Sequence, residues 1–192
     1  MTGGLTRLTS RAALLPGANI DTDVIMPKQF LKGIDRAGLA QGLFHDLRRD
    51  PAFVLNRVAG CEILITGPNF GCGSSREHAV WGLLQYGIRA VIGTSFAGIF
   101  ADNAANNGLL LITLDPDQYD RLVRDPGTVV IDLEAQAITS GDLNLTFEIE
   151  PRRRRAIMLG LDRIAQTLQQ ADAIRAFEAR YHGASPWLYV LR

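Results

Sequence analysis

Apolar residues recur along the chain in short runs that alternate with helix-like segments. Residues 61–66, 90–93 and 109–114 are predicted strands, because each is a short apolar run bounded by turn signals. Residues 75–86 and 100–107, which lie between these runs, are typical of helices. Strands separated by single helices predict parallel pairing with right-handed crossover connections.

The second half of the chain predicts one more helix, three strands and a terminal helix. Residues 115–124 form the predicted helix, with Asp115 as a possible N-cap and Pro116 at its first position. Three strands are then expected, at residues 129–133, 137–139 and 143–149, the last two joined by a Ser-Gly-Asp hairpin turn. Residues 172–181 have apolar and charged positions at helical spacing, and Gly183 is expected to end that helix.

The opening third is rich in turn residues and predicts long ordered loops with short strands. A short amphipathic helix is expected over residues 39–49, ended by an Asp-Pro pair. The arginines of residues 152–155 are interpreted as a solvated basic face. No internal repeat or low-complexity linker occurs, so residues 1–192 are expected to form one α/β domain. Its mixed or parallel central sheet is flanked by helices, with the helical region of about residues 152–183 packed on it.

Composition narrows the classes of partner and location. The 20 basic and 20 acidic residues balance, which gives no support to a nucleic-acid or anionic-membrane partner. No apolar run approaches the ~20 residues needed to span a bilayer. Residues 1–10 contain no apolar stretch of the kind that directs secretion, so a cytoplasmic protein is expected. Cys61 and Cys72 belong to no Cys/His ligand array, so no metal site is expected in this chain, and Cys61 is interpreted as a core residue.

The segment most informative about chemistry is residues 71–78, Gly-Cys-Gly-Ser-Ser-Arg-Glu-His. Ser74 and Glu77 fit a capping box, which by itself predicts only a well-capped helix. However, the glycines before Ser74 allow a ligand to approach the backbone, and free N–H groups at a helix start attract anions. Arg76 is disfavoured by the helix dipole there unless it faces a carboxylate. These features predict a carboxylate-binding cradle with a hydroxyl inside it.

The chemistry of Ser74 has two interpretations. It could be an acyl-transfer nucleophile with His78, four residues away, although the G-x-S-x-G turn of such enzymes is absent. Alternatively, the electropositive cradle could stabilise a serine alkoxide that acts as a general base. The nearby Asp21 and Asp23 could hold a metal ion, but acidic residues in a turn more often accept hydrogen bonds from neighbouring backbone N–H groups.

Several segments form a larger pattern in chain order. They are residues 67–79, residues 19–23 with 27–31, residues 95–100 with 107–110, and residues 160–162. Together they resemble the swivelling domain of the aconitase superfamily, a β/β/α domain like the C-terminal domain of aconitase. Within that superfamily they resemble the 3-isopropylmalate dehydratase small subunits. The resemblance extends over about residues 5 to 182.

The resemblance implies a role for each matching residue. The serine matching Ser74 is the base that removes the substrate C–H proton, and the arginine matching Arg76 binds a substrate carboxylate. Gly73 and Ser75 are expected to contact the substrate beside that carboxylate. The acid matching Asp23 is expected to orient the active site.

The resemblance also implies the reaction and the partners. It is a hydro-lyase reaction of leucine biosynthesis, in which 2-isopropylmalate loses water to give isopropylmaleate and regains it as 3-isopropylmalate. The [4Fe–4S] cluster of this family lies in a separate large subunit, so no cofactor is expected in this chain. Activity is expected only in a heterodimer or a larger complex with that subunit, acting on a small dicarboxylate.

Substrate choice is expected to depend on the loop at residues 26–33. Phe30 and Leu31 would contact an apolar isopropyl group, and Lys32 is a further substrate-binding candidate. Four positions depart from the residues usual in the family: Val80, Gly98, Leu111 and Leu159. The alternatives are therefore a related subunit for another malate or maleate derivative, of the citramalate or citraconate type, and a non-catalytic dicarboxylate-binding module.

Overall fold

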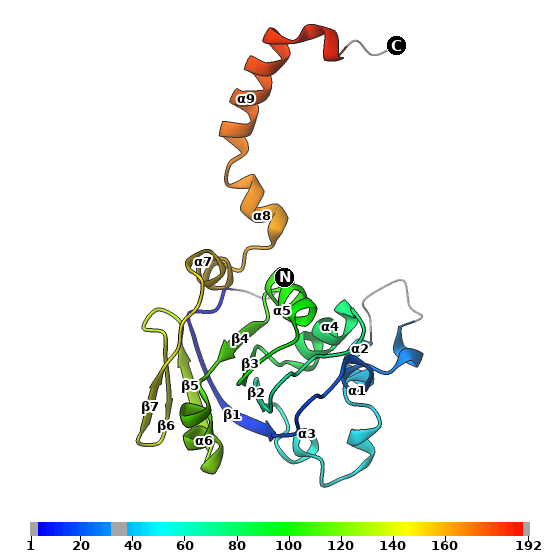
Figure 1. The fold of residues 1–192 in the computed structure, drawn as a ribbon, viewed down its shortest axis with the longest axis vertical. Helices are drawn as coiled ribbons and strands as arrows, with labels where there is room; N and C mark the ends of the chain where they lie inside the picture. Colours follow the sequence, from blue (N-terminus) through cyan, green and yellow to red (C-terminus); the bar gives the residue numbers. More distant parts are fainter. Residues whose placement is uncertain (1–3, 32–37, 190–192) are drawn as a thin grey trace.

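The computed structural model describes residues 4–31 and 38–189, and these form a seven-stranded mixed sheet of order β4-β3-β2-β1-β5-β6-β7 (Figure 1). Neighbours from β4 to β1 pair in parallel, and neighbours from β1 to β7 pair antiparallel. The strands are β1 (Arg7–Leu15), β2 (Ile63–Thr66), β3 (Ala90–Gly93), β4 (Leu110–Thr113), β5 (Thr128–Asp132), β6 (Ala137–Ser140) and β7 (Leu143–Thr146). The expected α/β class with a mixed sheet is confirmed.

The strand β1 is where the sheet changes from parallel to antiparallel, and the turn-rich opening third did not predict its full length. Ala12 pairs with Ile63 of β2 on one side, and Arg7 pairs with Asp132 of β5 on the other. Four of the first five residues of β1 are polar, so the start of the strand has the composition of a loop. Pairing on both sides supplies the backbone hydrogen bonds that make it a strand.

The helices α4 (Glu77–Tyr86), α5 (Gly98–Asn107) and α6 (Pro116–Arg124) follow β2, β3 and β4. The predicted strands and helices of this region are confirmed, with ends that differ by one or two residues. The N-cap prediction for α6 is also confirmed. The Asp115 carboxylate accepts the Gln118 N–H at 2.8 Å, and the Gln118 side chain accepts the Asp115 N–H at 3.3 Å.

Two apolar clusters cover the two faces of the sheet. Successive side chains of a strand point to opposite faces, so the wholly buried β2 and β3 supply both clusters. One cluster contains Ile63, Ile65 and residues of α6 and β5–β7. The other contains Leu64, Val91 and residues of α4 and α5. Cys61 lies in this second cluster, and burial raises the pKa of its thiol, as expected of a core residue.

The helix expected over residues 39–49 is two short segments instead, α2 (Leu39–Gly42) and η2 (Leu47–Arg49). Between them Phe44 has a φ of +47°, which breaks the helix. The Phe44 N–H donates to the Ile25 carbonyl at 2.9 Å, and its ring is fully buried. Burial of the aromatic ring therefore overrides the local helical pattern. The short helices of this region are α1 (Thr22–Ile25), η1 (Lys28–Phe30) and α3 (Val54–Arg57).

The arginine run begins α7 (Pro151–Leu159) and is not a wholly solvated face. Glu150 caps this helix by accepting the N–H groups of Arg152 and Arg153 at 3.0 and 2.8 Å, which lowers the pKa of its carboxyl. The Arg153 side chain is half-buried, and its desolvation lowers the pKa of the guanidinium although Asp102 and Glu150 oppose the shift. Ile157 packs into the core, so α7 is docked on the sheet.

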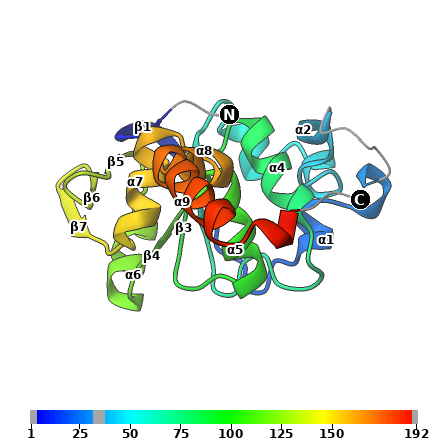
Figure 2. The same ribbon diagram turned by 90° about the horizontal axis from the view of Figure 1, so that it is seen from above.

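The remaining elements extend away from the sheet and its helices, as Figure 1 shows. They are α8 (Arg163–Leu168), α9 (Ala171–Ala184) and η3 (Pro186–Tyr189). No residue of α8 or α9 is buried, and from above the two helices project toward the viewer (Figure 2). The expected packing of residues 152–183 on the domain is therefore seen for α7 and not for α8 and α9. Gly183 lies inside α9, so its predicted role as a terminator is wrong.

None of the helices in the described ranges is both long enough and apolar enough to span a membrane.

The cap of α6 gives a direct test of local stability. We expect Asp115→Ala to lower the free energy of unfolding by about 1 kcal/mol, because the Gln118 N–H loses its acceptor. Urea denaturation measures the change, and Asp120→Ala, an exposed position in the same helix, is the control with no expected loss. Equal stability of the two variants would contradict the role of the cap.

Candidate active site

Three loops meet at the carboxyl ends of β1, β2 and β3. The Asn19 N–H donates to the Pro68 carbonyl at 2.9 Å, and the Gly71 N–H donates to the Ile20 carbonyl at 2.8 Å. The third loop joins through Ala97, whose N–H donates to the Phe70 carbonyl at 3.0 Å. Residue pairs Asp21–Cys72 and Phe70–Phe96 form isolated parallel bridges. The structure thus brings together the three motifs that the sequence placed in separate segments.

The turn between β2 and α4 needs glycine at two positions. Gly71 has a φ of +78°, and a side chain there would collide with the Phe100 ring. Gly73 has a φ of +89°, and its added Cβ would lie 3.3 Å from the Asp21 Cβ. These glycines let the loop after β1 lie directly against the turn that carries Ser74.

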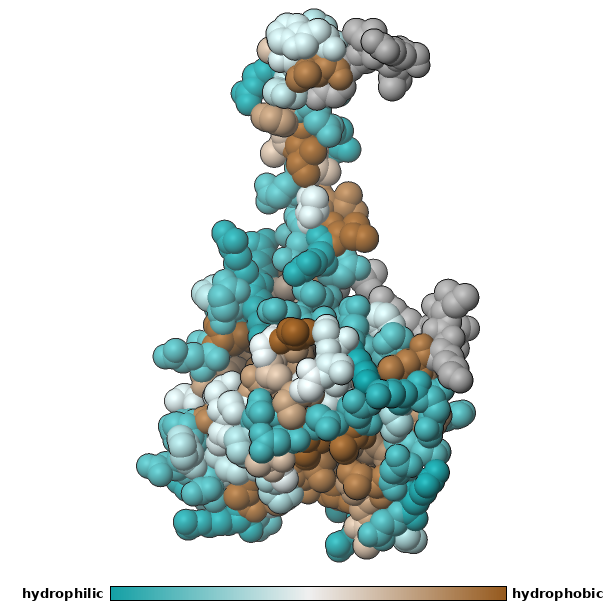
Figure 3. Space-filling model, turned by 45° about the vertical axis from the view of Figure 1, so that its right-hand side comes forward, coloured by the Kyte–Doolittle hydropathy of each residue, from teal (hydrophilic) through white to brown (hydrophobic). Residues whose placement is uncertain are grey.

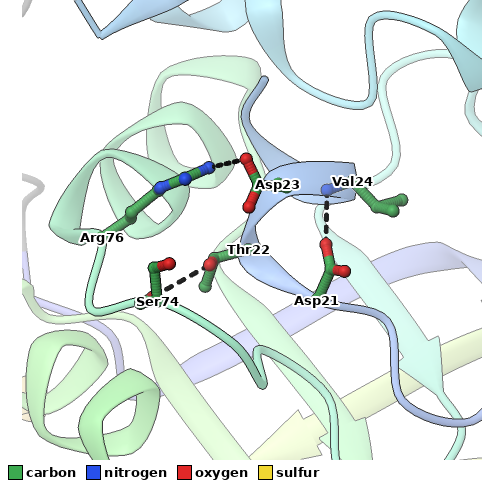
Figure 4. A network of polar contacts seen from close by, with 6 residues as sticks. All are labelled: Asp21, Thr22, Asp23, Val24, Ser74 and Arg76. Carbon is green, nitrogen blue, oxygen red and sulfur yellow. Dashed lines mark hydrogen bonds and ion pairs between the residues drawn. The ribbon is translucent and has the colours of Figure 1, made fainter. Parts of the chain in front are cut away.

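Thr22 fixes the backbone on both sides of Gly73. Its N–H donates to the Cys72 carbonyl at 2.8 Å, and its Oγ1 donates to the Ser74 carbonyl at 2.8 Å (Figure 4). The Thr22 residue is only 2% exposed, so these hydrogen bonds are shielded from water. Sequence reasoning missed this residue. The sequence pattern that could have identified Thr22 is a hydroxyl residue between Asp21 and Asp23, in a turn that lies against the segment carrying Ser74.

Arg76 and Asp23 form an ion pair at the rim of the same turn (Figure 4). The Arg76 side chain is 10% exposed, whereas the Asp23 side chain is 44% exposed. A carboxylate therefore lies opposite Arg76, but it belongs to Asp23 of the chain itself and not to the ligand that the sequence predicted. Asp21 instead caps α1, since its Oδ1 accepts the Val24 N–H at 2.7 Å. Asp21 therefore accepts a neighbouring backbone N–H, as the turn interpretation expects, whereas Asp23 accepts from a distant side chain instead.

The predicted capping box at Ser74 and Glu77 is wrong. Helix α4 begins at Glu77, and its N-cap is Arg76, which has an extended backbone with φ −128° and ψ 102°. The Glu77 carboxylate accepts a hydrogen bond from Asn107 of α5 at 2.6 Å, so it is engaged away from Ser74. Ser74 therefore lies three residues before the first residue of the helix, in the turn.

Ser74 and Ser75 are both exposed, and they lie in the turn beside Arg76. Among the described residues, the Ser74 Oγ has no hydrogen-bond partner within the chain. His78 packs its ring against Trp81, with 4.8 Å between the ring centroids, and makes no hydrogen bond to Ser74 in the part of the chain described. The serine–histidine pair of an acyl-transfer enzyme is thus not formed.

The specificity candidates lie in and after η1. Phe30 is half-buried, and its ring centroid lies 4.9 Å from that of His45. A side chain at Gly42 would collide with the Phe30 ring, so the glycine provides the space for it. Leu31 is half-buried and packs, like Phe30, against the apolar cluster that contains Leu64 and Val91. Lys32 lies outside the described residues.

The donor set of the chain does not fit a metal cluster. Within residues 4–31 and 38–189, no three His, Cys, Asp or Glu side chains are grouped where they could hold a metal ion. The chain has two cysteines, Cys61 in the core and Cys72 half-buried in the turn. A [4Fe–4S] cluster is ordinarily held by four thiolates, more than these two cysteines supply.

The fold and the turn at Ser74 place the chain in a known class. Residues 3–117 match the aconitase C-terminal domain family, and residues 164–189 match the C-terminal domain of the 3-isopropylmalate dehydratase small subunit. The chain belongs to the family of 3-isopropylmalate dehydratase small subunits.

Individual relatives agree with this assignment over nearly the whole chain. The small subunit from Phenylobacterium zucineum is 50% identical, over 95% of this chain and 97% of the relative. The small subunit 1 from Mannheimia succiniciproducens is 48% identical over the same shares. The crystal structure of 3-isopropylmalate dehydratase from Methanocaldococcus jannaschii superposes with a TM-score of 0.70 at 32% identity, covering 90% of this chain and 99% of that one.

The buried hydroxyl of Thr22 gives a test of how the turn is held. We expect Thr22→Val to lower the free energy of unfolding by about 1–2 kcal/mol, because the Ser74 carbonyl loses its donor. Amide hydrogen exchange over residues 72–76 should also become faster. The control is Thr113→Val, an exposed strand position for which neither change is expected. Unchanged exchange in Thr22→Val would contradict the clamping role.

Proposed function

We propose that this chain supplies the general base and the carboxylate-binding residues of an enzyme that interconverts 2-isopropylmalate and 3-isopropylmalate through isopropylmaleate. As a member of the small-subunit family, it is a subunit of a hydro-lyase and works with a large-subunit partner. The observation that supports its catalytic role is the exposed Ser74 in a glycine turn beside the nearly buried Arg76.

Arg76 is proposed to bind a substrate carboxylate. Its guanidinium is already removed from water by the fold, so its attraction for an anion is screened less than that of a surface arginine. A guanidinium has five N–H donors, and Asp23 therefore does not exhaust them. Asp23 is proposed to hold Arg76 in position, while Gly73 and Ser75 contact the same end of the substrate.

Ser74 is proposed to remove and return the substrate proton. Within the described chain, the N–H groups of Gly73, Ser74 and Ser75 donate to no backbone carbonyl, so they are available to an anion. Together with the Arg76 charge they favour the alkoxide form of the Ser74 Oγ. The Oγ takes the C–H proton as the hydroxyl leaves the adjacent carbon and the C=C bond of isopropylmaleate forms. A hydroxide then adds to the carbon that lost the proton, and Ser74 returns that proton to the carbon that lost the hydroxyl.

The departing hydroxyl needs an acid, which we assign to the partner subunit. A [4Fe–4S] cluster in the large subunit is proposed to supply that Lewis acid when bound there. The exposure of Ser74 and Ser75 supports a shared site, because one side of the turn is open to solvent in this chain alone. A partner surface over the turn would exclude water from the reacting groups.

The two alternative functions, a subunit for another malate or maleate derivative and a non-catalytic dicarboxylate-binding module, are not favoured. The relatives named above are 3-isopropylmalate dehydratase small subunits. Val80 and Leu111, two of the departures from the usual residues, lie in the apolar core, where they affect packing. Gly98 and Leu159 are exposed, Gly98 at the start of α5 and Leu159 at the end of α7. None of these positions lies in the turn that carries Ser74 and Arg76.

Replacing the proposed base separates chemistry from assembly. We expect Ser74→Ala, reconstituted with the large subunit, to lower kcat by at least about 100-fold, because the proton has no acceptor. Ser75→Ala should mainly raise KM, since it removes a contact to bound substrate. Steady-state kinetics with 2-isopropylmalate measures both effects, and size-exclusion chromatography checks that each complex assembles. Retention of full activity by Ser74→Ala would exclude this serine as the base.

The apolar candidates near η1 are tested by substrate choice. We expect Leu31→Ala to reduce the ratio of kcat/KM for isopropylmalate over methylmalate by about tenfold, because an apolar contact to the isopropyl group is lost. The control is Val54→Ala, which truncates another half-buried side chain of the same apolar cluster. An unchanged ratio in Leu31→Ala would place the specificity contact elsewhere.

A further inference from the structure

The chain carries an apolar stripe on an arm that its own domain leaves uncovered. We define the arm as residues 163–189, which comprise α8, α9 and η3. Of the large apolar side chains exposed in the described chain, only Val24, Leu47 and Ile99 precede Leu159. Leu159 itself ends α7, and the remaining seven lie on the arm: Ile164, Leu168, Ile174, Phe177, Tyr181, Trp187 and Leu188. Figure 3 shows brown side chains along the narrow arm, among teal ones.

The arrangement on α9 is that of a helix face built for contact. Ile174, Phe177 and Tyr181 follow the i, i+3, i+7 spacing of one helix face. The Phe177 and Tyr181 rings are stacked with 5.5 Å between their centroids, so the stripe is continuous. Asp172 and Arg175 form an ion pair toward the other side of the helix, with 99% and 71% of their side chains exposed.

An isolated arm of this kind has little to stabilise it. Helix α9 has 14 residues and no buried side chain, and isolated helices of ~12–15 residues are marginal in water. In proteins, such helices are stabilised chiefly by packing an apolar face against another surface. In the described body, the four exposed large apolar side chains belong to separate elements, α1, η2, α5 and α7, so they form no matching stripe for the arm.

We propose that the arm is a docking element for the large subunit of the enzyme. Residues 164–189 match a C-terminal domain that is defined for the small subunits of this dehydratase, whose common partner is the large subunit. The seven exposed side chains, at on the order of 100 Å² each, offer roughly 700 Å² of surface. A stable interface of standard size buries about 800 Å² per partner. The arm therefore presents enough surface for a specific contact.

A second copy of the chain covers this surface less completely. Pairing of two α9 helices would bury only Ile174, Phe177 and Tyr181, the stripe on one helix face. Ile164 and Leu168 of α8, and Trp187 and Leu188 of η3, lie on separate short elements and would stay exposed. An extended surface of a larger protein can contact all three elements.

Substitutions on the stripe test the docking directly in the full-length chain. We expect Phe177→Gln/Tyr181→Gln to weaken binding to the purified large subunit of the same organism by at least about 30-fold, because aromatic side chains are common interface anchors. Trp187→Gln/Leu188→Gln should weaken it by a similar factor. The matched control, Asp172→Gln/Arg175→Gln, changes two residues on the other side of α9 without changing net charge and should bind like the wild type.

Isothermal titration calorimetry gives the Kd of each variant, and sedimentation velocity gives the oligomeric state of the chain alone. Wild-type affinity in both stripe variants would overturn the proposal. So would a change in self-association of the chain without a change in large-subunit affinity, which would assign the arm to a second copy. Circular dichroism checks that each variant keeps its helical content.

The inference rests on the proposed large-subunit partner but not on the proposed chemistry. The Ser74→Ala chain should bind the large subunit with wild-type affinity while lacking activity. A tight complex that fails to isomerise isopropylmalate would contradict the proposed function and leave the docking role intact. An active complex whose affinity is insensitive to the stripe would contradict only the docking role.

Discussion

The backbone hydrogen bonds between the loops that follow β1, β2 and β3 determine where every candidate catalytic group lies. The loop after β1 contacts the Ser74 turn through Asn19, Ile20 and Thr22, and the loop after β3 contacts it through Ala97. In open α/β sheets, ligands bind outside the carboxyl ends of strands where the strand order reverses. Here β1 is that point, because β2 to β4 follow one another on one side of it and β5 to β7 on the other. The topology therefore places a ligand site where these three loops meet.

The close approach of these loops explains the unusual residues of the turn. Positive φ values at Gly71 and Gly73, and a ring of Phe100 directly beside Gly71, exclude larger residues. The same approach places Asp23 against Arg76 across the turn. An arginine buried without a counter-ion would be costly, so Asp23 stabilises it in the free chain and leaves it ready for a carboxylate of the substrate. A single geometric constraint thus accounts for the glycines, the ion pair and the exposed hydroxyl.

The sequence predicted the elements whose own residues determine their structure. Strands β2, β3 and β4 are wholly or nearly apolar, and α6 has its own capping residues, so local patterns were sufficient. The predictions failed where contacts with residues distant in the sequence determine the local structure. The polar start of β1 is a strand because β1 pairs with a strand on each side. Phe44 breaks a helix because its ring is buried, and Glu77 accepts a hydrogen bond from Asn107 and does not cap the helix with Ser74. Thr22 could not have been found for the same reason, since its partners are 50 or more residues away.

The open turn and the uncovered arm have the same physical explanation. A serine base works best in a site that excludes water, but Ser74 is exposed. An apolar stripe is stable only when another surface covers it, but Phe177 and Tyr181 are 53% and 40% exposed. Within the described chain the sheet has both faces packed, so its core is complete without the arm. The two incomplete surfaces therefore do not reflect an incomplete fold. They fit the proposal that a large subunit completes both surfaces, with the proposed site and the proposed docking element on different parts of the chain.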